Sequence, residues 1–364
     1  MLQVILDFGV LKIGQWSLPL RVHAYGLMMV LGFLTGIVLA KWRAKRAGED
    51  AEKAAACCVL SLVGGIVGAR AAYVIQHWED EFAFSPNRLG AVVNITSGGL
   101  IYYGGVVLAI VLVVGYLLAR RLPVRRYLDF LAISLMVGLA FGRTGCLLNG
   151  CCYGGLCRHD WPLAMRFPMY SKPLLKLDGR ANPYSRTTEG PTPPYSHHRE
   201  AGWIRPDPAL VDSAGFLIPP RDFDQRQTRI AETSHSLPVQ PAQALAIVNA
   251  LLIAAVLWGF YRLRRREGQV FAAMLVLYSI ARFILEGIRD DNPHDLLAGV
   301  LTHNQYTSVV TFLAGVLMLA VIWKLPASAG PAAGAHNPPA AAQADAGARR
   351  QDARDTGHKR RRGK

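Results

Sequence analysis

Seven apolar stretches dominate this sequence, and each reaches the roughly 17 to 25 residues that a helix needs to cross a bilayer. The first 20 residues carry Asp7 and Lys12 and lack a small-residue cleavage site, so we expect a short interfacial segment and not a removable signal peptide. The sequence therefore predicts an all-α fold, a polytopic membrane bundle of seven helices. The stretches run over 24–41, 54–76, 98–119, 127–149, 242–261, 269–286 and 305–324.

Basic residues near the ends of these spans predict the orientation of the chain. The sequence has 40 Lys plus Arg against 25 Asp plus Glu, a formal net charge of +15. The clusters KWRAKR, RRLPVRR and RLRRRE follow the first, third and fifth spans, and KRRRGK ends the tail after the seventh. Because Lys and Arg collect on the cytoplasmic side, we expect the N-terminus outside and the C-terminus in the cytoplasm. Charges placed in this way orient a membrane protein, and we expect no nucleic-acid partner.

Two segments fall outside the predicted spans. Residues 150–238 are rich in Pro, Arg, Ser and Tyr with little apolar periodicity, which indicates an outer-face head or a partly ordered lid. Residues 326–364 are Ala, Gly, Pro and Arg-rich, which is typical of a disordered basic tail that attracts anionic lipid headgroups. We therefore expect one membrane domain over 1–325, carrying the outer-face insertion, and a cytoplasmic tail.

Four ionisable residues lie toward the outer ends of the second, fourth and sixth spans: Arg70, Arg143, Arg282 and Glu286. Charge inside hydrocarbon is costly and marks a functional site by default. Planar guanidinium groups match phosphate oxygens, so three of them predict a bound phosphate. Two structural alternatives stay open, since Arg70 could extend to the outer headgroups and Arg282 could form a self-contained ion pair with Glu286 four residues on.

Tyrosines and glycines open the first and third spans. Tyr102 and Tyr103 stand between two glycine pairs, and Tyr25 precedes Gly26 at the head of the first span. Tyrosine at such positions is common in the aromatic belt of a membrane protein. The glycine pairs indicate either close helix packing or close approach of a ligand.

Four of the six cysteines gather at the outer end of the fourth span, at Cys146, Cys151, Cys152 and Cys157. On an oxidising outer face, disulfides that pin the following loop are expected, while free thiols and a metal site are the alternatives. The spacing lacks the paired CxxC arrangement of a zinc site, so we assign no metal ligand. The remaining pair, at 57 and 58, is expected to be apolar packing.

Six motifs together resemble one family. HAYGLMMVLGF, GARAAYV, GGLIYYGG, FGRTGCLLNGCCYG, QPAQ and RFILEGIRDDNP closely resemble the bacterial prolipoprotein diacylglyceryl transferases, in the order of that family and across all seven spans. The resemblance implies a multi-pass enzyme of the bacterial inner membrane that needs no cofactor. Such an enzyme moves the diacylglyceryl group of phosphatidylglycerol onto the lipobox cysteine thiol of a preprolipoprotein and releases glycerol phosphate.

The resemblance also implies roles for individual residues. Arg143 would bind the phospholipid headgroup, and Arg282 would hold the phosphate while Glu286 orients it. Arg70 joins the substrate-binding candidates as a further intramembrane arginine. Four more residues align with positions that the family uses around its site: Tyr25, Asn149, Gly150 and Gly154.

Three departures from the family pattern leave the chemistry open. Tyr103 stands where the family has the histidine of its HGG motif, Cys146 replaces a common Asn, and HPxQLYE has shrunk to QPAQALA at 240–246. We keep Tyr103 as the catalytic candidate, although a phenol with an ordinary pKa near 10 is a poor base unless arginines lower it. Two other functions remain as alternatives, namely a non-catalytic lipid-binding paralogue and a thiol-based metal or redox membrane protein.

Overall fold

The computed structural model describes residues 3–13, 16–84, 87–94, 98–158, 161–171, 175–176, 190–289 and 301–325. Within these ranges, seven helices are long and apolar enough to cross a membrane, and each coincides with one expected span. The predicted seven-span helical class is therefore confirmed, whereas the tail expected at 326–364 lies outside the described residues. The helices are α1 (Ala24–Arg46), α2 (Ala51–Gln76), α4 (Tyr102–Ala119), α5 (Val124–Asn149), α8 (Ala242–Leu263), α9 (Gln269–Glu286) and α10 (His303–Lys324).

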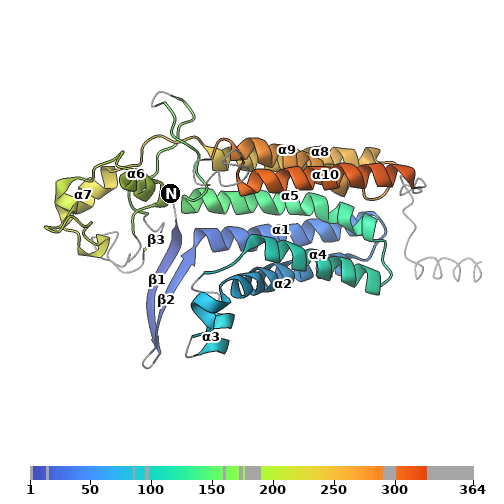
Figure 1. The fold of residues 1–364 in the computed structure, drawn as a ribbon, viewed down its shortest axis with the longest axis horizontal. Helices are drawn as coiled ribbons and strands as arrows, with labels where there is room; N and C mark the ends of the chain where they lie inside the picture. Colours follow the sequence, from blue (N-terminus) through green and yellow to red (C-terminus); the bar gives the residue numbers. More distant parts are fainter. Residues whose placement is uncertain are drawn as a thin grey trace, which may run out of the picture. The chain divides into compact units, whose positions relative to one another are not determined.

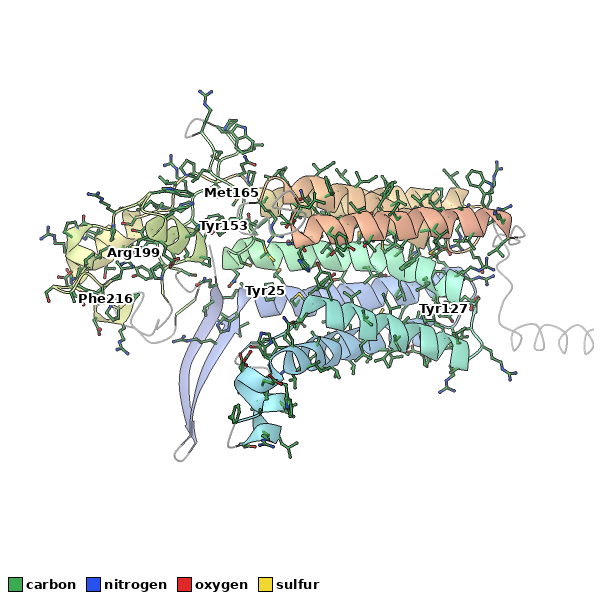
Figure 2. The ribbon with its side chains drawn as sticks, viewed as in Figure 1. Tyr25, Tyr127, Tyr153, Met165, Arg199 and Phe216 are labelled. Carbon is green, nitrogen blue, oxygen red and sulfur yellow. The ribbon has the colours of Figure 1, made fainter. Side chains whose placement is uncertain are left out.

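The spanning helices run side by side, with α5 at the centre of the bundle (Figure 1). α5 packs against α1, α8 and α9, while α2 packs against α1 and α4, and α10 packs against α9. Tyr127, Phe130 and Ile133 of α5 are buried in the two apolar clusters at the core of the bundle. Tyr25 and Tyr127 lie toward opposite ends of the bundle (Figure 2).

Glycines bring α2 and α4 into backbone contact. A Cβ added to Gly68 would overlap the carbonyl oxygen of Gly104, and one added to Gly105 would lie 2.5 Å from the carbonyl oxygen of Gly65. Small residues commonly permit such close helix approach within membranes. Of the two explanations for the glycine pairs beside Tyr103, helix packing holds for Gly104 and Gly105.

The connections that carry basic clusters meet at one end of the bundle, which we call the basic end. Arg126 at the start of α5 donates to Glu267 at 2.6 Å and to Glu49 at 2.5 Å, so three connections are joined there. Arg266 donates to the carbonyl of Ile322 at 3.2 Å, which places the end of α10 at the same end. The three clusters within the described residues share one end, as the predicted topology requires. KRRRGK lies outside the described residues, and the orientation in a membrane stays a prediction.

A buried carboxylate fixes the start of α9 at the basic end. Asp129 of α5 is fully buried and accepts hydrogen bonds from Arg264 at 2.5 Å and from the backbone amides of Gly268 at 2.8 Å and Phe271 at 2.9 Å. The first amides of a helix lack acceptors within it, so this carboxylate accepts from N–H groups that would otherwise have no hydrogen-bond partner. Arg264 offsets its charge in the core.

The N-terminal segment forms strands that the sequence did not predict. β1 (Val4–Ile13) pairs antiparallel with β2 (Trp16–His23), and β3 (Leu175–Lys176) adds to β1 in parallel, giving the order β2-β1-β3. β2 runs directly into α1, so this hairpin precedes the first span where we expected an unspecified interfacial segment. Between α2 and α4 lie the short helices η1 (Trp78–Phe82) and α3 (Arg88–Val93).

The described part of the 150–238 insertion packs around a small apolar core of its own. It contains α6 (Pro193–Glu200), η2 (Pro208–Leu210), η3 (Pro220–Asp222) and α7 (Gln225–Thr233). Antiparallel bridges from Leu156 and Met165 to Val239 join it to the segment that enters α8. This part of the insertion is therefore a packed head. Its core consists of Met169, Tyr170, Tyr195, Leu210, Phe223 and Ala231.

Candidate functional site

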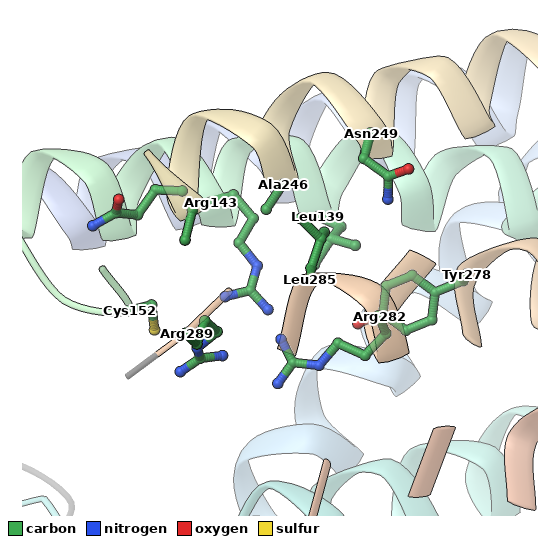
Figure 3. Close-up of a pocket in the computed structure, with 11 residues that line it drawn as sticks. Leu139, Arg143, Cys152, Ala246, Asn249, Tyr278, Arg282, Leu285 and Arg289 are labelled. Carbon is green, nitrogen blue, oxygen red and sulfur yellow. The ribbon is translucent and has the colours of Figure 1, made fainter. Parts of the chain in front are cut away.

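A pocket lies between α5, α8 and α9 at the end of the bundle opposite to the basic end (Figures 1 and 3). It holds about 420 Å³ of space, its open mouth included. The residues that line it are Leu139, Arg143, Cys152, Ala242, Gln243, Ala246, Asn249, Tyr278, Arg282, Leu285 and Arg289. Its walls thus combine apolar side chains with a few polar ones, as small-ligand sites usually do.

Three arginines converge on this pocket. Arg143 comes from α5, Arg282 from α9 and Arg289 from the turn that follows α9, and Figure 3 shows their guanidinium groups directed toward the same space. Forked N–H donors of this kind recognise phosphate and carboxylate oxygens. Two of the three predicted site arginines, Arg143 and Arg282, are therefore brought together by the fold.

Glu286 orients two of these arginines. Its side chain is buried, and its carboxylate lies 3.4 Å from Arg282 and 3.7 Å from Arg289. The other carboxylate oxygen accepts hydrogen bonds from Asn304 at 2.8 Å and from Thr302 at 3.4 Å, both near the start of α10. The predicted pair of Arg282 with Glu286 does form, and it is extended to a second arginine. Among the described residues, three guanidinium groups and this one carboxylate meet at the pocket.

Two predicted glycines shape the backbone beside the pocket. Gly150 ends α5 in the left-handed region, with φ 76° and ψ 23°, a conformation that glycine adopts at little cost. The chain then folds back, so that Cys152 lines the pocket. The amide of Gly154 donates to the carbonyl of Gln240 at 3.2 Å, and a Cβ added to Gly154 would lie 2.7 Å from that oxygen. Any side chain there would push the start of α8 away.

All six cysteines are free thiols, so the expected disulfides are not formed. The Sγ atoms of Cys146, Cys151 and Cys152 lie within 4.8 Å of one another. Hydrogen bonds with the Cys146 and Cys151 thiols, helped by the charges of Arg289 and Arg143, lower the pKa of the Cys152 thiol. The pair at 57 and 58 is buried in the bundle core, as predicted for packing residues.

Tyr103 is turned toward α10 and is not among the residues that line the pocket. Its hydroxyl lies 3.0 Å from the Thr307 hydroxyl and donates to the side-chain oxygen of Asn304 at 3.4 Å. Asn304 in turn donates to Glu286, so Tyr103 reaches the arginines through two intermediate side chains. Its neighbour Tyr102 is largely exposed.

The sequence of this chain matches the model of the prolipoprotein diacylglyceryl transferase family over residues 13–321, well over half of its length. The chain belongs to this family. It is therefore an enzyme that transfers a diacylglyceryl group to prolipoproteins, and the hypothesis drawn from its motifs is confirmed.

Bacterial relatives named phosphatidylglycerol–prolipoprotein diacylglyceryl transferase are similar to the chain over most of their length. The protein of Rhodopirellula baltica is 28% identical, covering 83% of this chain and 73% of its own. The Paraburkholderia phymatum protein is also 28% identical, covering 83% and 89%. The Bdellovibrio bacteriovorus protein is 26% identical, covering 88% and 91%.

Arg70 has a different set of partners from the other intramembrane arginines of this transferase. It is 8% exposed, and its donors bond four backbone carbonyls in the connection between α2 and α4. Nε donates to Val92 at 2.9 Å, Nη2 to Ala91 at 2.7 Å, and Nη1 to Gly98 at 3.0 Å and Gly99 at 2.9 Å. Arg70 does not line the pocket, and it neither extends to solvent nor faces the other arginines.

Tyr25 and Asn149 border the pocket of the transferase without lining it. Tyr25 packs on α5, because a Cβ added to Gly145 would lie 3.0 Å from its ring. The carbonyl of Asn149 accepts a hydrogen bond from the Gln3 side chain at 3.2 Å, which ties the end of α5 to the start of the chain.

Sequence reasoning missed several pocket residues of this transferase, although a helical reading would have found two of them. Tyr278 lies four residues before Arg282, and Arg289 lies seven residues after Arg282. Helical spacing therefore places all three residues on the same side. Gln243 stands in the shortened QPAQ motif, and Asn249 is a lone polar residue in an apolar span. Only the fold shows that these two positions of α8 line the same pocket as the arginines.

Proposed function

We propose that this transferase uses phosphatidylglycerol as its lipid donor and that the arginine pocket binds the donor headgroup. The acceptor is the lipobox cysteine of a preprolipoprotein, and the enzyme resides in the bacterial inner membrane. The convergence of Arg143, Arg282 and Arg289 on one pocket carries this proposal. In the orientation that we propose, with the N-terminus outside and the tail of 326–364 in the cytoplasm, the pocket and the head lie on the outer side.

Catalysis follows from the charge that develops on the leaving group. The acceptor sulfur attacks the diacylglyceryl carbon that carries the phosphate, the carbon–oxygen bond breaks, and its electron pair stays on the phosphate oxygen. Guanidinium donors set in place beforehand stabilise this charge without reorganisation. Arg143 and Arg282 bind the phosphate, Arg289 adds a third positive charge, and Glu286 holds two of the three in position.

A buried amide supplies a contact for the headgroup hydroxyls. Gln243 is 1% exposed and lines the pocket, and its Nε2 donates to the carbonyl of Cys151 at 2.9 Å. Its Oε1 has no hydrogen-bond partner among the described residues. Because buried acceptors are usually satisfied, a donor brought by the substrate fits here, and the glycerol headgroup of phosphatidylglycerol carries two hydroxyls.

Gln243→Met tests this contact, since methionine keeps the length of the side chain and removes its acceptor. We expect the preference for phosphatidylglycerol over phosphatidylethanol, which lacks the headgroup hydroxyls, to fall about tenfold, as for the loss of about 1 to 2 kcal/mol of hydrogen bonding. This preference is measured as the ratio of kcat/KM for the two lipids, in the variant and in wild type. An unchanged ratio would show that Gln243 does not hydrogen-bond to the headgroup hydroxyls.

The proposed function itself is tested with the full chain reconstituted in vesicles. We expect a lipobox peptide to gain the mass of one diacylglyceryl group when the vesicles contain phosphatidylglycerol, with release of glycerol phosphate. A peptide with serine in place of the lipobox cysteine, and vesicles of phosphatidylethanolamine alone, should give no adduct. Absence of the adduct with phosphatidylglycerol, under conditions where the Rhodopirellula baltica relative forms it, would refute the assignment of donor and acceptor.

A further inference from the structure

The thiol of Cys152 lies in the pocket but has no part in the mechanism above. It lines the pocket together with Arg143 and Arg289 (Figure 3). Its Sγ atom also lies within 4.8 Å of the Sγ atoms of Cys146 and Cys151. The thiol therefore faces the space where the phosphate is proposed to bind, with two further thiols behind it.

The surroundings of Cys152 favour its thiolate. Arg143 of α5 and Arg289 after α9 line the same pocket and contribute positive charge, and the Sγ atoms of Cys146 and Cys151 lie within 4.8 Å of its sulfur. From α1, the Tyr25 hydroxyl is a further titratable group that interacts with the three thiols. Cationic neighbours lower the pKa of a cysteine, and the thiolate is its reactive form.

The backbone at Cys152 is also held in an uncommon conformation. Its φ is 59°, in the left-handed region that residues other than glycine rarely adopt. The turn before it is fixed by hydrogen bonds from the amides of Gly150 and Cys151 to the carbonyl of Cys146, at 2.8 and 3.2 Å. Strain of this kind persists where the surrounding structure imposes it, and it is concentrated at functional sites.

The reaction needs a group that removes the proton of the acceptor thiol, whose ordinary pKa is near 8.5. Tyr103 does not line the pocket, and its hydroxyl is engaged with Thr307 and Asn304. The exposed ring of His303 lies 6.4 Å from the ring of Tyr103, on the α10 side. Among the described residues, Cys152 is the only titratable group besides Tyr278 and the arginines that lines the pocket.

We propose that Cys152, as a thiolate, is the general base that accepts the proton of the lipobox thiol. The proposal rests on the proposed function. The acceptor S–H bond breaks, its proton passes to Cys152 Sγ, and the acceptor sulfur forms the thioether bond as the phosphate leaves with the carbon–oxygen electron pair. The proton then leaves Cys152 for the departing phosphate or for water, which restores the thiolate. No oxidant or metal takes part.

The first experiment measures transfer as a function of pH. We expect Cys152→Ala to lower kcat at pH 7 about 100-fold, the usual lower contribution of a general base. Its remaining rate should rise about tenfold per pH unit up to about pH 8.5, because the acceptor must then ionise by itself. Wild type should lose activity only at lower pH, as Cys152 becomes protonated. Cys152→Asp, which restores an anionic base, should recover part of the loss.

The second experiment tests the thiolate directly by alkylation of the full chain in vesicles, with each cysteine followed by peptide mass. Cys157 is the matched control, because it lies outside the cluster and partial burial raises its pKa. We expect iodoacetamide to modify Cys152 at pH 6 while Cys157 stays unmodified. Cys157→Ala should transfer at the wild-type rate.

Several outcomes would overturn the proposal. Cys152→Ala with at least half of the wild-type rate and an unchanged pH profile would show that the base lies elsewhere. If transfer were lost in Tyr103→Phe or in His303→Asn but not in Cys152→Ala, the general base would lie on α4 or α10. If each chain bound one metal ion tightly and lost it on replacement of Cys152, the thiols would be metal ligands and not a base. A wild-type enzyme that forms no adduct would instead refute the proposed function.

Discussion

Replacing Arg143 with alanine is expected to lower the rate of diacylglyceryl transfer about 100- to 1000-fold, the effect of removing one positioned donor from a developing oxyanion. Arg143 is the only arginine on α5 among the described residues that line the pocket, so no other arginine of this helix can take over its role. Steady-state kinetics with phosphatidylglycerol and a lipobox peptide measure the effect. Full activity of this variant would mean that the phosphate binds elsewhere.

Two further variants separate charge from geometry at this position. Arg143→Lys keeps the positive charge but loses the planar, forked donors of arginine, so we expect its rate of transfer to lie between those of wild type and Arg143→Ala. Arg120→Ala is the matched control, because Arg120 is an exposed arginine beyond α4 at the basic end. It should transfer at the wild-type rate.

Glu286→Ala is expected to abolish measurable transfer and to destabilise the fold as well. The change leaves Arg282 and Arg289 without the carboxylate that orients them, and it removes the acceptor for Asn304. Breaking a buried ion pair on one side typically costs about 3 to 5 kcal/mol, because the remaining charge stays buried without compensation. Unfolding in detergent and transfer kinetics are measured on the same preparation.

Glu286→Gln separates the two effects. Its amide oxygen can still accept from Asn304, so we expect a folded protein whose transfer falls at least tenfold because the arginines lose their anionic partner. The double variant Arg282→Ala with Glu286→Gln should be less impaired than the product of the two single losses, since both act on one interaction. Strict additivity would show that Glu286 does not act through Arg282.

The fold was largely predictable because apolar length is a strong signal for spanning helices. The seven helices begin and end within a few residues of the expected bounds, whereas β1 and β2 were missed. Their sequence mixes apolar residues with Asp7 and Lys12 and lacks a sustained period. Strand pairing depends on a partner segment that local sequence does not reveal.

The candidate site was predictable where the membrane makes a residue type improbable. Arg143 and Arg282 were found because charge is costly within hydrocarbon. The same reasoning selected Arg70, whose carbonyl partners belong to a connection with no sequence signature. The cysteines were expected to pair on an oxidising face, but the turn at Gly150 brings three of them together beside arginines as thiols.

The basic end of the bundle and the contact between α4 and α10 are held by different kinds of bond. At the basic end, Arg126 joins Glu49 and Glu267 by charge-assisted hydrogen bonds across three connections. The described side-chain bonds between α4 and α10, from Tyr103 to Asn304 and between Tyr103 and Thr307, are neutral ones of about 1 kcal/mol each. We therefore expect helices that part for acyl chains to separate more readily between α4 and α10 than at the basic end.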